Sequence, residues 1–297
     1  MQIPYTQQQQ IVIRKVAGYA KVKARLNMRN RGYVKFPVEK KDGSKRWIHA
    51  PHYIVKSAQQ TVLKNTPSPS VIQNDHEVIT GFVPGRSILD NARPHVGKHV
   101  VLSVDLKNFF PSIAPRQVKE AFGLFGPEEV KLITTSKLRL PQGAPTSPMI
   151  ANWVCVEGDS LLVEYCNEHK LTYTRYADDL TFSAIRDIPQ DVVDNLIRLI
   201  NVVFGPKVNI APNKIKFMRK HKQQRVTGIV VNEKLSIPRA RRRQMRAFMH
   251  DAEVNGVNTA LARYSRSVHH IFGDLSFLHL AHEAEAERYI EQFKELL

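Results

Sequence analysis

The chain has 297 residues, with 44 lysines and arginines against 27 aspartates and glutamates, and a formal net charge of +17 at pH 7. A hydrophobic content of 42% and a charged content of 24% indicate a globular protein with a buried core and exclude a disordered polyelectrolyte. The excess of positive charge predicts a polyanionic partner, nucleic acid above all, because basic surfaces attract phosphates and release counterions.

Signals for export or membrane insertion are not apparent. The longest mainly apolar strings, such as residues 100 to 106, are too short to cross a bilayer. The N-terminal sequence MQIPYTQQQQ lacks the basic and then apolar order of a signal peptide. Two cysteines, Cys155 and Cys166, are too few for a disulfide framework. We therefore expect a cytoplasmic protein with no membrane partner.

The predicted elements mix helices and strands as far as Pro238 and are helical beyond it. Residues 11 to 26 predict a helix with a basic solvent face, and the turn residues around Lys41 and Asp42 predict a hairpin. The most apolar strand covers residues 100 to 106. The hairpin strands are expected at 33 to 38 and 46 to 49, further helices at 115 to 125, 150 to 168 and 191 to 204, and further strands at 171 to 176, 180 to 184 and 225 to 231.

Three carboxylates lie where an apolar strand or hairpin ends. Asp105 closes a buried strand, where a carboxylate costs several kcal/mol unless it is hydrogen-bonded, paired or bound to a metal; capping of the following turn is the simpler explanation. Asp178 and Asp179 lie at the tip of a hairpin, although Asn-Gly or Asp-Gly would make the easier turn. A divalent cation such as Mg²⁺ would remove their repulsion. Two ions held this way, beside a basic surface, predict nucleotidyl transfer on nucleic acid.

Five ordered segments carry a family resemblance. Tyr176-Ala177-Asp178-Asp179 resembles the YxDD signature of reverse transcriptases, residues 104–110 resemble their first catalytic segment, and residues 140–148 resemble their LPQG-x-x-x-SP loop. The NAxxH pattern at residues 91–95 and the VTG pattern at 226–228 narrow the resemblance to retron reverse transcriptases. It extends from about Lys40 to Ile237.

The resemblance implies an α+β right-hand polymerase with fingers, palm and a C-terminal helical thumb. Residues 1–95 would form the N-terminal region and fingers, 96–235 the palm with a fingers insertion at about 113–140, and 236–297 the thumb. Such an enzyme uses dNTPs and two Mg²⁺ ions to copy a structured non-coding RNA, both template and primer, into a branched RNA-linked single-stranded DNA. The family further implies antiviral defence with a separate effector protein, and RNA removal by a host ribonuclease H.

Two alternatives stay open. One is another bacterial reverse transcriptase, of the abortive-infection or group II intron type, against which the NAxxH and VTG segments argue. The other is a catalytically silent RNA-binding scaffold, against which the intact Asp105, Asp178 and Asp179 argue.

The resemblance assigns catalysis and metal binding to Asp105, Asp178 and Asp179, with Asp179 less directly involved. Phe110 would act as a steric gate against a ribose 2′-OH, while Phe109 packs in the core. The remaining nucleotide-binding residues are expected to be Lys45, Arg46, Gln142, Gly143 and Lys214, with Lys40 and Lys41 as alternatives to the first two.

RNA contacts are expected in three places: a glycine-bearing turn at residues 81 to 88, the two retron segments, and a basic helix after Pro238. The residues are Arg86, Asn91, His95, Val226, Thr227, Gly228, Arg239, Arg242, Arg243 and Arg246. For His95 a structural role is the alternative, and for the arginines a solvated helix face. The cluster of His279, His282 and Glu283 is expected to be a solvent-exposed face and not a metal site.

Overall fold

The computed structural model describes residues 2–28, 32–40, 43–69, 77–123, 126–134, 139–204 and 210–297, without the side chains of residues 127, 128 and 211–214. The chain divides into two compact units. The first comprises Met1–Ser87, Leu102–Phe182 and Ile188–Lys216, and the second Ile88–Val101, Ser183–Asp187 and Phe217–Leu297. Within the described ranges, every helix is too short or too polar to cross a membrane.

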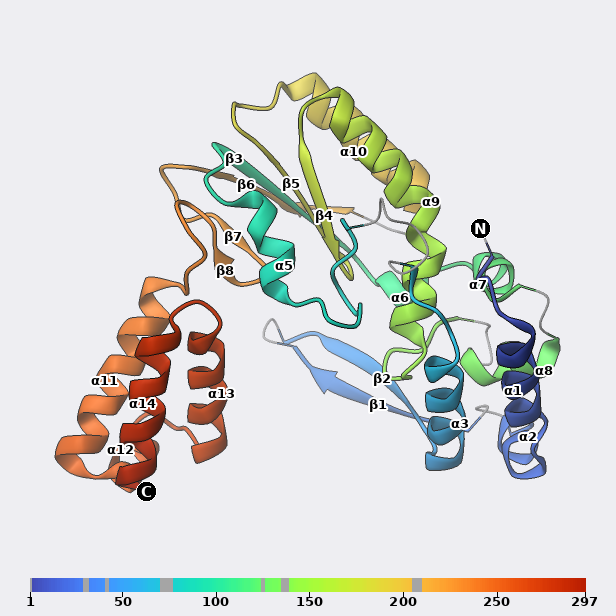
Figure 1. Ribbon diagram of the computed structural model, residues 1–297, viewed down its shortest axis with the longest axis horizontal. Helices are drawn as coiled ribbons and strands as arrows, with labels where there is room; N and C mark the ends of the chain where they lie inside the picture. Colours follow the sequence, from blue (N-terminus) through green and yellow to red (C-terminus); the bar gives the residue numbers. More distant parts are fainter. Residues whose placement is uncertain are drawn as a thin grey trace. The chain divides into compact units, whose positions relative to one another are not determined.

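Two short helices open the first unit (Figure 1). α1 (Gln7–Gly18) starts with a capping box, in which the hydroxyl of Thr6 accepts from the N–H of Gln9 and the Gln9 side chain accepts from the N–H of Thr6. α2 (Ala20–Leu26) follows Tyr19. The single helix predicted over residues 11 to 26 is wrong, because Gly18 is a weak helix former and Tyr19 is extended, with ψ 131°.

The predicted hairpin is confirmed in the first unit. β1 (Tyr33–Glu39) pairs antiparallel with β2 (Lys45–Pro51), with Val38 opposite Arg46. The turn residues Lys41 and Asp42 lie outside the described residues. Helices α3 (Tyr53–Lys64) and α8 (Pro127–Ile133) pack with α1 and α2 beside it.

A four-stranded sheet of order β4-β5-β3-β6 carries the predicted catalytic segments. Its strands are β3 (Val100–Leu106), β4 (Thr172–Tyr176), β5 (Asp179–Ala184) and β6 (Ile210–Arg219). β3 has the predicted bounds, and both β4 and β5 are confirmed to within a residue.

Two long helices of the first unit were also predicted. α9 (Ser147–Glu168) begins three residues earlier than expected, and α10 (Gln190–Phe204) packs against it (Figure 1). α6 (Phe109–Ser112) and α7 (Pro115–Phe122) follow β3. The prediction for α7 extended to residue 125, and residues 124 and 125 lie outside the described part.

The second unit ends in four helices, as predicted after Pro238. They are α11 (Arg239–Asn255), α12 (Val257–Arg263), α13 (Val268–His279) and α14 (Glu283–Leu296). Their apolar faces meet in a core that includes Phe248, Leu275 and Phe293. The core's aromatic rings meet edge to face, with 5.9 Å between the centroids of Phe248 and Phe293.

One strand prediction in the second unit is wrong. Residues 225 to 231 form no single strand, but two short ones, β7 (Arg225–Val226) and β8 (Ile229–Val230). The chain reverses between them because Thr227 and Gly228 both have positive φ, 47° and 87°. Two such residues make the tight turn whose twist suits a hairpin.

His95 is a buried structural residue of the second unit. It ends the 3₁₀ helix η1 (Arg93–His95) after α5 (Ile88–Ala92), and its Nδ1 lies 2.7 Å from the Oγ of Ser183. Burial, together with the nearby charge of Lys98, lowers the pKa of His95 to about 3. The imidazole is therefore neutral at physiological pH and is fully enclosed.

This pKa predicts a stability loss in mild acid. The unfolded chain takes up a proton at His95 below its ordinary pKa of 6.5, whereas the folded chain does so only near pH 3. The free energy of unfolding should therefore fall between pH 6.5 and 3, by about 2 kcal/mol at pH 5. Urea unfolding of the wild type and of His95→Gln at pH 7 and pH 5 measures this contribution.

In that experiment, His95→Gln should lose less stability on acidification than the wild type. The exposed His221 provides the matched control, since His221→Gln should behave as the wild type does. Equal losses in the wild type and in His95→Gln would contradict a buried neutral imidazole.

Candidate active site

An open cleft of about 690 Å³ in the first unit brings together most of the residues predicted for catalysis and nucleotide binding. Asp105 and Asp178 line it, both half-buried. Lys45, Arg46, Phe110 and Gln142 line it as well. Lys214 cannot be placed, because its side chain is outside the described part of the structure.

Asp105 and Asp178 meet because two neighbouring strands place them there. Asp105 is the penultimate residue of β3, and the N–H of the next residue, Leu106, donates to the carbonyl of Asp178 at 3.0 Å. Asp178 lies in the turn between β4 and β5, where Ala177 has a left-handed backbone with φ 57°. The turn thus points one carboxylate into the cleft beside that of Asp105.

Asp179 is placed differently. It is the first residue of β5 and does not line the cleft. Within the described ranges, the ligand atoms of Asp105, Asp178 and Asp179 do not all lie within 4.8 Å of one another. The structure therefore presents two carboxylates directly to the cleft and the third beside them.

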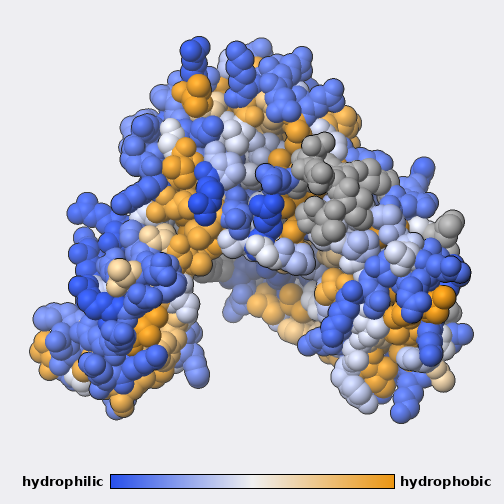
Figure 2. Space-filling model, in the orientation of Figure 1, coloured by the Kyte–Doolittle hydropathy of each residue, from blue (hydrophilic) through white to orange (hydrophobic). Residues whose placement is uncertain are grey.

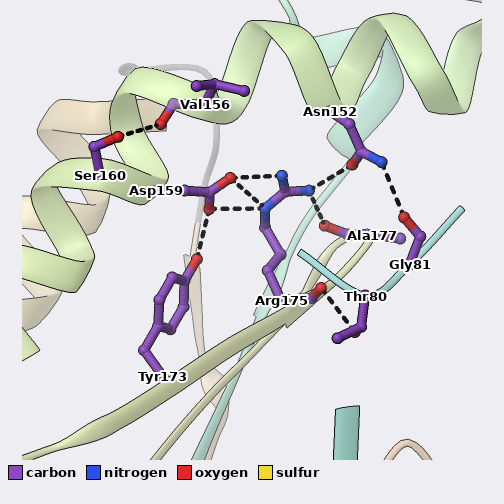
Figure 3. Close-up of polar contacts among 9 residues, drawn as sticks. All are labelled: Thr80, Gly81, Asn152, Val156, Asp159, Ser160, Tyr173, Arg175 and Ala177. Atoms are coloured by element: carbon purple, nitrogen blue, oxygen red, sulfur yellow. Dashed lines mark hydrogen bonds and ion pairs between the residues drawn. The ribbon is translucent and has the colours of Figure 1, made fainter. Parts of the chain in front are cut away.

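A buried ion pair lies behind the β4–β5 turn that carries Asp178, which we call the catalytic turn after the role predicted for Asp178 (Figure 3). Arg175 on β4 and Asp159 on α9 are both fully buried, and the guanidinium donates two parallel hydrogen bonds, Nε to Oδ1 at 2.9 Å and Nη2 to Oδ2 at 2.6 Å. Tyr173 donates its hydroxyl proton to Asp159 at 2.8 Å. Burial by itself lowers the pKa of Arg175, but the Asp159 charge outweighs it and the net shift is upward. Arg175 thus stays charged inside the protein.

The same arginine holds the turn that carries Asp178. Its Nη1 donates to the carbonyl of Ala177 at 3.3 Å and to the side chain of Asn152 at 3.0 Å. Asn152 in turn donates to the carbonyl of Gly81 at 2.9 Å, as Figure 3 shows. One guanidinium therefore connects α9, β4, the catalytic turn and the segment at Gly81.

Gly81 is a site residue that the sequence analysis placed only in a glycine-bearing turn. A Cβ at this position would lie 2.5 Å from the backbone nitrogen of Ala177 and 3.0 Å from the Cα of Tyr176. Only glycine lets the two backbones approach so closely. The signal in the sequence was the Gly81-Phe82 pair, but nothing there indicated its partner.

Aromatic rings line the cleft next to Asp105. Phe109 is 3% exposed and packs in the core, whereas Phe110 is half-buried and faces the cleft. Phe82, which the sequence analysis did not single out, is 47% exposed and also lines the cleft. Its ring centroid lies 6.3 Å from that of Phe110 and 6.2 Å from that of Tyr176.

Basic side chains make the rest of the cleft attractive to an anion. Lys45 and Arg46 at the start of β2 line it as predicted, and so does the alternative Lys40. Lys107 and Arg139 also line it and were not predicted. Their sequence signal was proximity to two motifs, since Lys107 follows Asp105 by two residues and Arg139 directly precedes the LPQG segment.

Gly143 serves a different contact from the expected one. The sequence suggested close approach of its backbone to a nucleotide, but a Cβ here would meet β2, at 3.0 Å from Ile48 Cγ2 and 3.1 Å from the His49 carbonyl. The N–H of His49 also donates to the carbonyl of Gln142 at 2.8 Å. The loop is thus fixed to the hairpin, which leaves the Gln142 side chain in the cleft.

The predicted RNA-binding residues are dispersed. In the second unit, Asn91, His95 and Val226 are buried, and the Thr227 hydroxyl donates to the carbonyl of Ile88 at 3.1 Å. These residues fix the hairpin and α5 in place, and Gly228 alone of the VTG segment is exposed. In the first unit, Arg86 lies 3.6 Å from Glu77.

The arginines of α11 fall into two groups. Arg242 pairs with Glu285 at 2.6 Å, and Arg241 with Asp274 at 2.5 Å. Arg239, Arg243 and Arg246 are exposed. Arg241 is exposed as well, so the groups differ in pairing: among the described residues, only the second group forms no ion pair.

The predicted histidine cluster lies where α13 ends and α14 begins. His279, Glu283 and Glu287 place their ligand atoms within 4.8 Å of one another, but all three are exposed. His282 is turned away to Ser236, at 2.8 Å. The arrangement has the character of a charged helix surface.

Residues 38–231 match the family model described as reverse transcriptase (RNA-dependent DNA polymerase), so the chain belongs to the reverse transcriptases. It is 33% identical to the Retron Ec86 reverse transcriptase of Escherichia coli over 82% of this chain and 74% of that protein, and 30% identical to the Retron Ec83 enzyme of the same species over 89% and 87%. Within the family it is a retron reverse transcriptase, as the motifs predicted.

Two longer relatives come from Myxococcus xanthus. The chain is 36% identical to the Retron Mx162 reverse transcriptase over 89% of its own length, and 35% identical to the Retron Mx65 reverse transcriptase over 88%. It spans only 61% and 64% of the lengths of these two proteins.

The buried pair predicts a large stability effect. Arg175→Met leaves the Asp159 carboxylate buried without its partner, and should lower the free energy of unfolding by about 3–5 kcal/mol. Asp159→Leu combined with Arg175→Met should cost less than the two single changes added together, because no charge is left unpaired. Urea unfolding of the four proteins measures the coupling.

The exposed pair of Arg219 and Asp187, at 3.0 Å, is the control. Asp187→Ala should change the stability by less than about 1 kcal/mol, because solvent screens exposed pairs. Equal effects at the two pairs would show that burial does not set the strength of the Arg175 interaction.

Proposed function

We propose that this protein is the RNA-directed DNA polymerase of a retron, which copies a structured non-coding RNA into a branched, RNA-linked single-stranded DNA. The observation that carries the proposal is the meeting of Asp105 and Asp178 in one cleft whose other charged lining residues are lysines and arginines. Carboxylates beside cations suit a metal-assisted reaction of a nucleoside triphosphate. RNA is proposed as the template because the chain is similar to retron reverse transcriptases.

The donor set fits magnesium. Asp105 and Asp178 offer hard carboxylate oxygens on the cleft wall, with Asp179 next to them, and Mg²⁺ prefers such ligands together with phosphates and water. Bound in pairs, the ions would activate the attacking hydroxyl and stabilise the leaving oxygen.

The chain's own residues would bind and orient the nucleotide. Lys45 and Arg46, with Lys107 and Arg139 in the same cleft, would hold the triphosphate through charge-assisted hydrogen bonds. The Gln142 amide would contact the nucleotide or the template. The ring of Phe110 would lie under the sugar and exclude a 2′-OH, which selects dNTPs. Lys214 remains a proposed contributor to leaving-group protonation.

In this proposal the hairpin and N-terminal helices are fingers, the sheet with α9 and α10 is the palm, and α11–α14 form the thumb. The exposed Arg239, Arg243 and Arg246, together with Arg86, would contact the RNA backbone, while Arg242 would first have to leave Glu285. Asn91, His95, Val226 and Thr227 would act by fixing the RNA-facing segments. A separate effector protein, removal of RNA by ribonuclease H, and antiviral defence are proposed from the family resemblance.

Removal of one metal-binding carboxylate tests the reaction. Asp178→Asn should reduce Mg²⁺-dependent dTTP incorporation on poly(rA)·oligo(dT) about a thousandfold or more, since loss of a few kcal/mol of transition-state stabilisation has that effect. Asp179→Asn should have a smaller effect, because Asp179 does not line the cleft. The exposed Asp191 on α10 is the control, with Asp191→Asn as active as the wild type.

The nucleic acid that copurifies with wild type and Asp178→Asn distinguishes the enzyme from a scaffold. We expect RNA joined to DNA with the wild type and RNA alone with the variant. RNA-linked DNA from both proteins would contradict the proposed catalytic site, and RNA alone from both would favour the RNA-binding scaffold.

The gate assignment predicts a change in sugar selection. Phe110→Ala should lower the ratio of kcat/KM for dTTP over UTP at least about tenfold, because the ring that clashes with the 2′-OH is gone. Phe217→Ala, a partly exposed phenylalanine of the second unit, should leave the ratio unchanged. An unchanged ratio in Phe110→Ala would contradict the proposed role of Phe110 as the steric gate.

A further inference from the structure

The N-terminal part of the chain has an unusual charge. Residues 1–38 contain eight lysines and arginines and no aspartate or glutamate, so they carry nearly half of the net charge of +17 in about an eighth of the chain. The eight residues are Arg14, Lys15, Lys21, Lys23, Arg25, Arg29, Arg31 and Lys35. Within the described part of the chain, which leaves out Arg29 and Arg31, none of these residues lines the cleft. All eight lie outside the five motifs of the family.

The fold turns part of this charge outward. α1 and α2 bury Ile13, Val16, Ala17, Val22 and Leu26 in their packing with α3 and α8. The opposite sides expose Arg14 and Lys15 on α1, and Lys21 and Lys23 on α2. We call these four residues, with Tyr19 between the helices, the N-terminal basic face. Figure 2 shows mainly hydrophilic residues with some apolar ones over this part of the first unit.

The arrangement is unfavourable without a partner. Lys21 lies in the first turn of α2, where the helix dipole disfavours a cation, and neither helix has an acidic residue in its first turn. Among the described residues, Lys15, Lys21 and Lys23 form no ion pair, whereas exposed cations elsewhere do, such as Arg116 with Glu120. An anionic partner would offset the repulsion among these lysines.

The chemistry of this face suits nucleic acid better than a simple solvated surface. Tyr19 is 50% exposed in the middle of the cations. Exposed aromatic rings among lysines and arginines bind nucleic acid by stacking on bases while the cations contact phosphates. Other aromatic rings are also exposed, such as Tyr53 at 73%, so it is the surrounding cations, and not exposure alone, that make Tyr19 suited to nucleic acid.

We propose that the N-terminal basic face is a docking surface for the phosphate backbone of the folded RNA, separate from the catalytic cleft. This inference rests on the proposed function for the identity of the polyanion. The face would hold the structured part of the template RNA while its single-stranded part is copied in the cleft. Loss of the face should then weaken RNA binding but leave the chemistry on a short primer–template intact.

Charge reversal in the full chain tests this. The triple variant Lys15→Glu/Lys21→Glu/Lys23→Glu should bind a fluorescein-labelled RNA stem–loop on the order of tenfold more weakly or worse, and the slope of log affinity against log KCl should fall by about 2 to 3. Its dTTP incorporation on poly(rA)·oligo(dT) should stay within about twofold of wild type, since no cleft residue is changed. Thermal unfolding checks that the fold is intact.

The matched control changes the same total charge elsewhere. Lys170→Glu/Arg198→Glu/Lys222→Glu replaces three exposed cations outside the face and should bind the stem–loop nearly as the wild type does. Equal weakening by both triples would reduce the effect to net charge and overturn the proposal. Unchanged RNA binding by the N-terminal triple would also overturn the proposal. The same holds if this variant binds RNA normally but loses binding to phosphatidylserine vesicles.

The test of the docking surface can fail independently of the test of the proposed function. If the wild type incorporated no dTTP with Mg²⁺, the polymerase proposal would fail, whatever the RNA binding of the N-terminal triple. If the wild type polymerised and the N-terminal triple bound RNA normally, only the docking surface would fail.

Discussion

The geometry of the cleft depends on the buried ion pair between Arg175 and Asp159. Taking both charges out of water is expensive, and only good geometry and further hydrogen bonds offset the loss. Here the guanidinium makes paired bonds to the carboxylate, and its remaining donor reaches Asn152 and the carbonyl of Ala177. An apolar pair of the same volume could fill the space, but it could not bind that carbonyl. Loss of one partner alone is costly, but compared with an apolar pair the ion pair contributes the position of the turn more than stability.

The hydrogen bond from Arg175 matters because few other contacts fix the conformation of the catalytic turn. Ala177 is held in a left-handed conformation that costs an alanine roughly 1–2 kcal/mol. The hydrogen bond from Arg175 to its carbonyl, the backbone bond from Leu106 to Asp178, and the close contact with Gly81 all act within two residues of this strain. Together they fix the direction of the Asp178 carboxylate before any ligand binds. Such preorganisation is what electrostatic catalysis requires.

The sequence predicted those features that local patterns determine. Strand β3, the β4–β5 hairpin and the helical C-terminal region follow from hydrophobic periodicity, and the three aspartates follow from carboxylates at strand ends. The break at Tyr19 and the turn at Thr227 were missed, because each depends on one backbone conformation inside a continuous pattern. The partners of Gly81, Gly143 and Arg175 are distant in sequence, so no local pattern could indicate them. Arg139 was missed for another reason: it directly precedes the LPQG segment, but a single basic residue beside a motif is not distinctive in so basic a chain.

Phe82 shows how backbone strain and exposure combine in this cleft. A phenylalanine with φ 60° is rare, and a bulky side chain in this region is normally avoided. The same residue keeps its ring 47% exposed, so burial does not compensate for the strain. What the conformation achieves is contact with the rings of Phe110 and Tyr176. Neighbouring Gly81 can approach the catalytic turn only because it lacks a Cβ. The Gly81-Phe82 pair therefore links the backbone of the turn to the aromatic wall of the cleft. A substitution at either residue should alter both the turn and this wall.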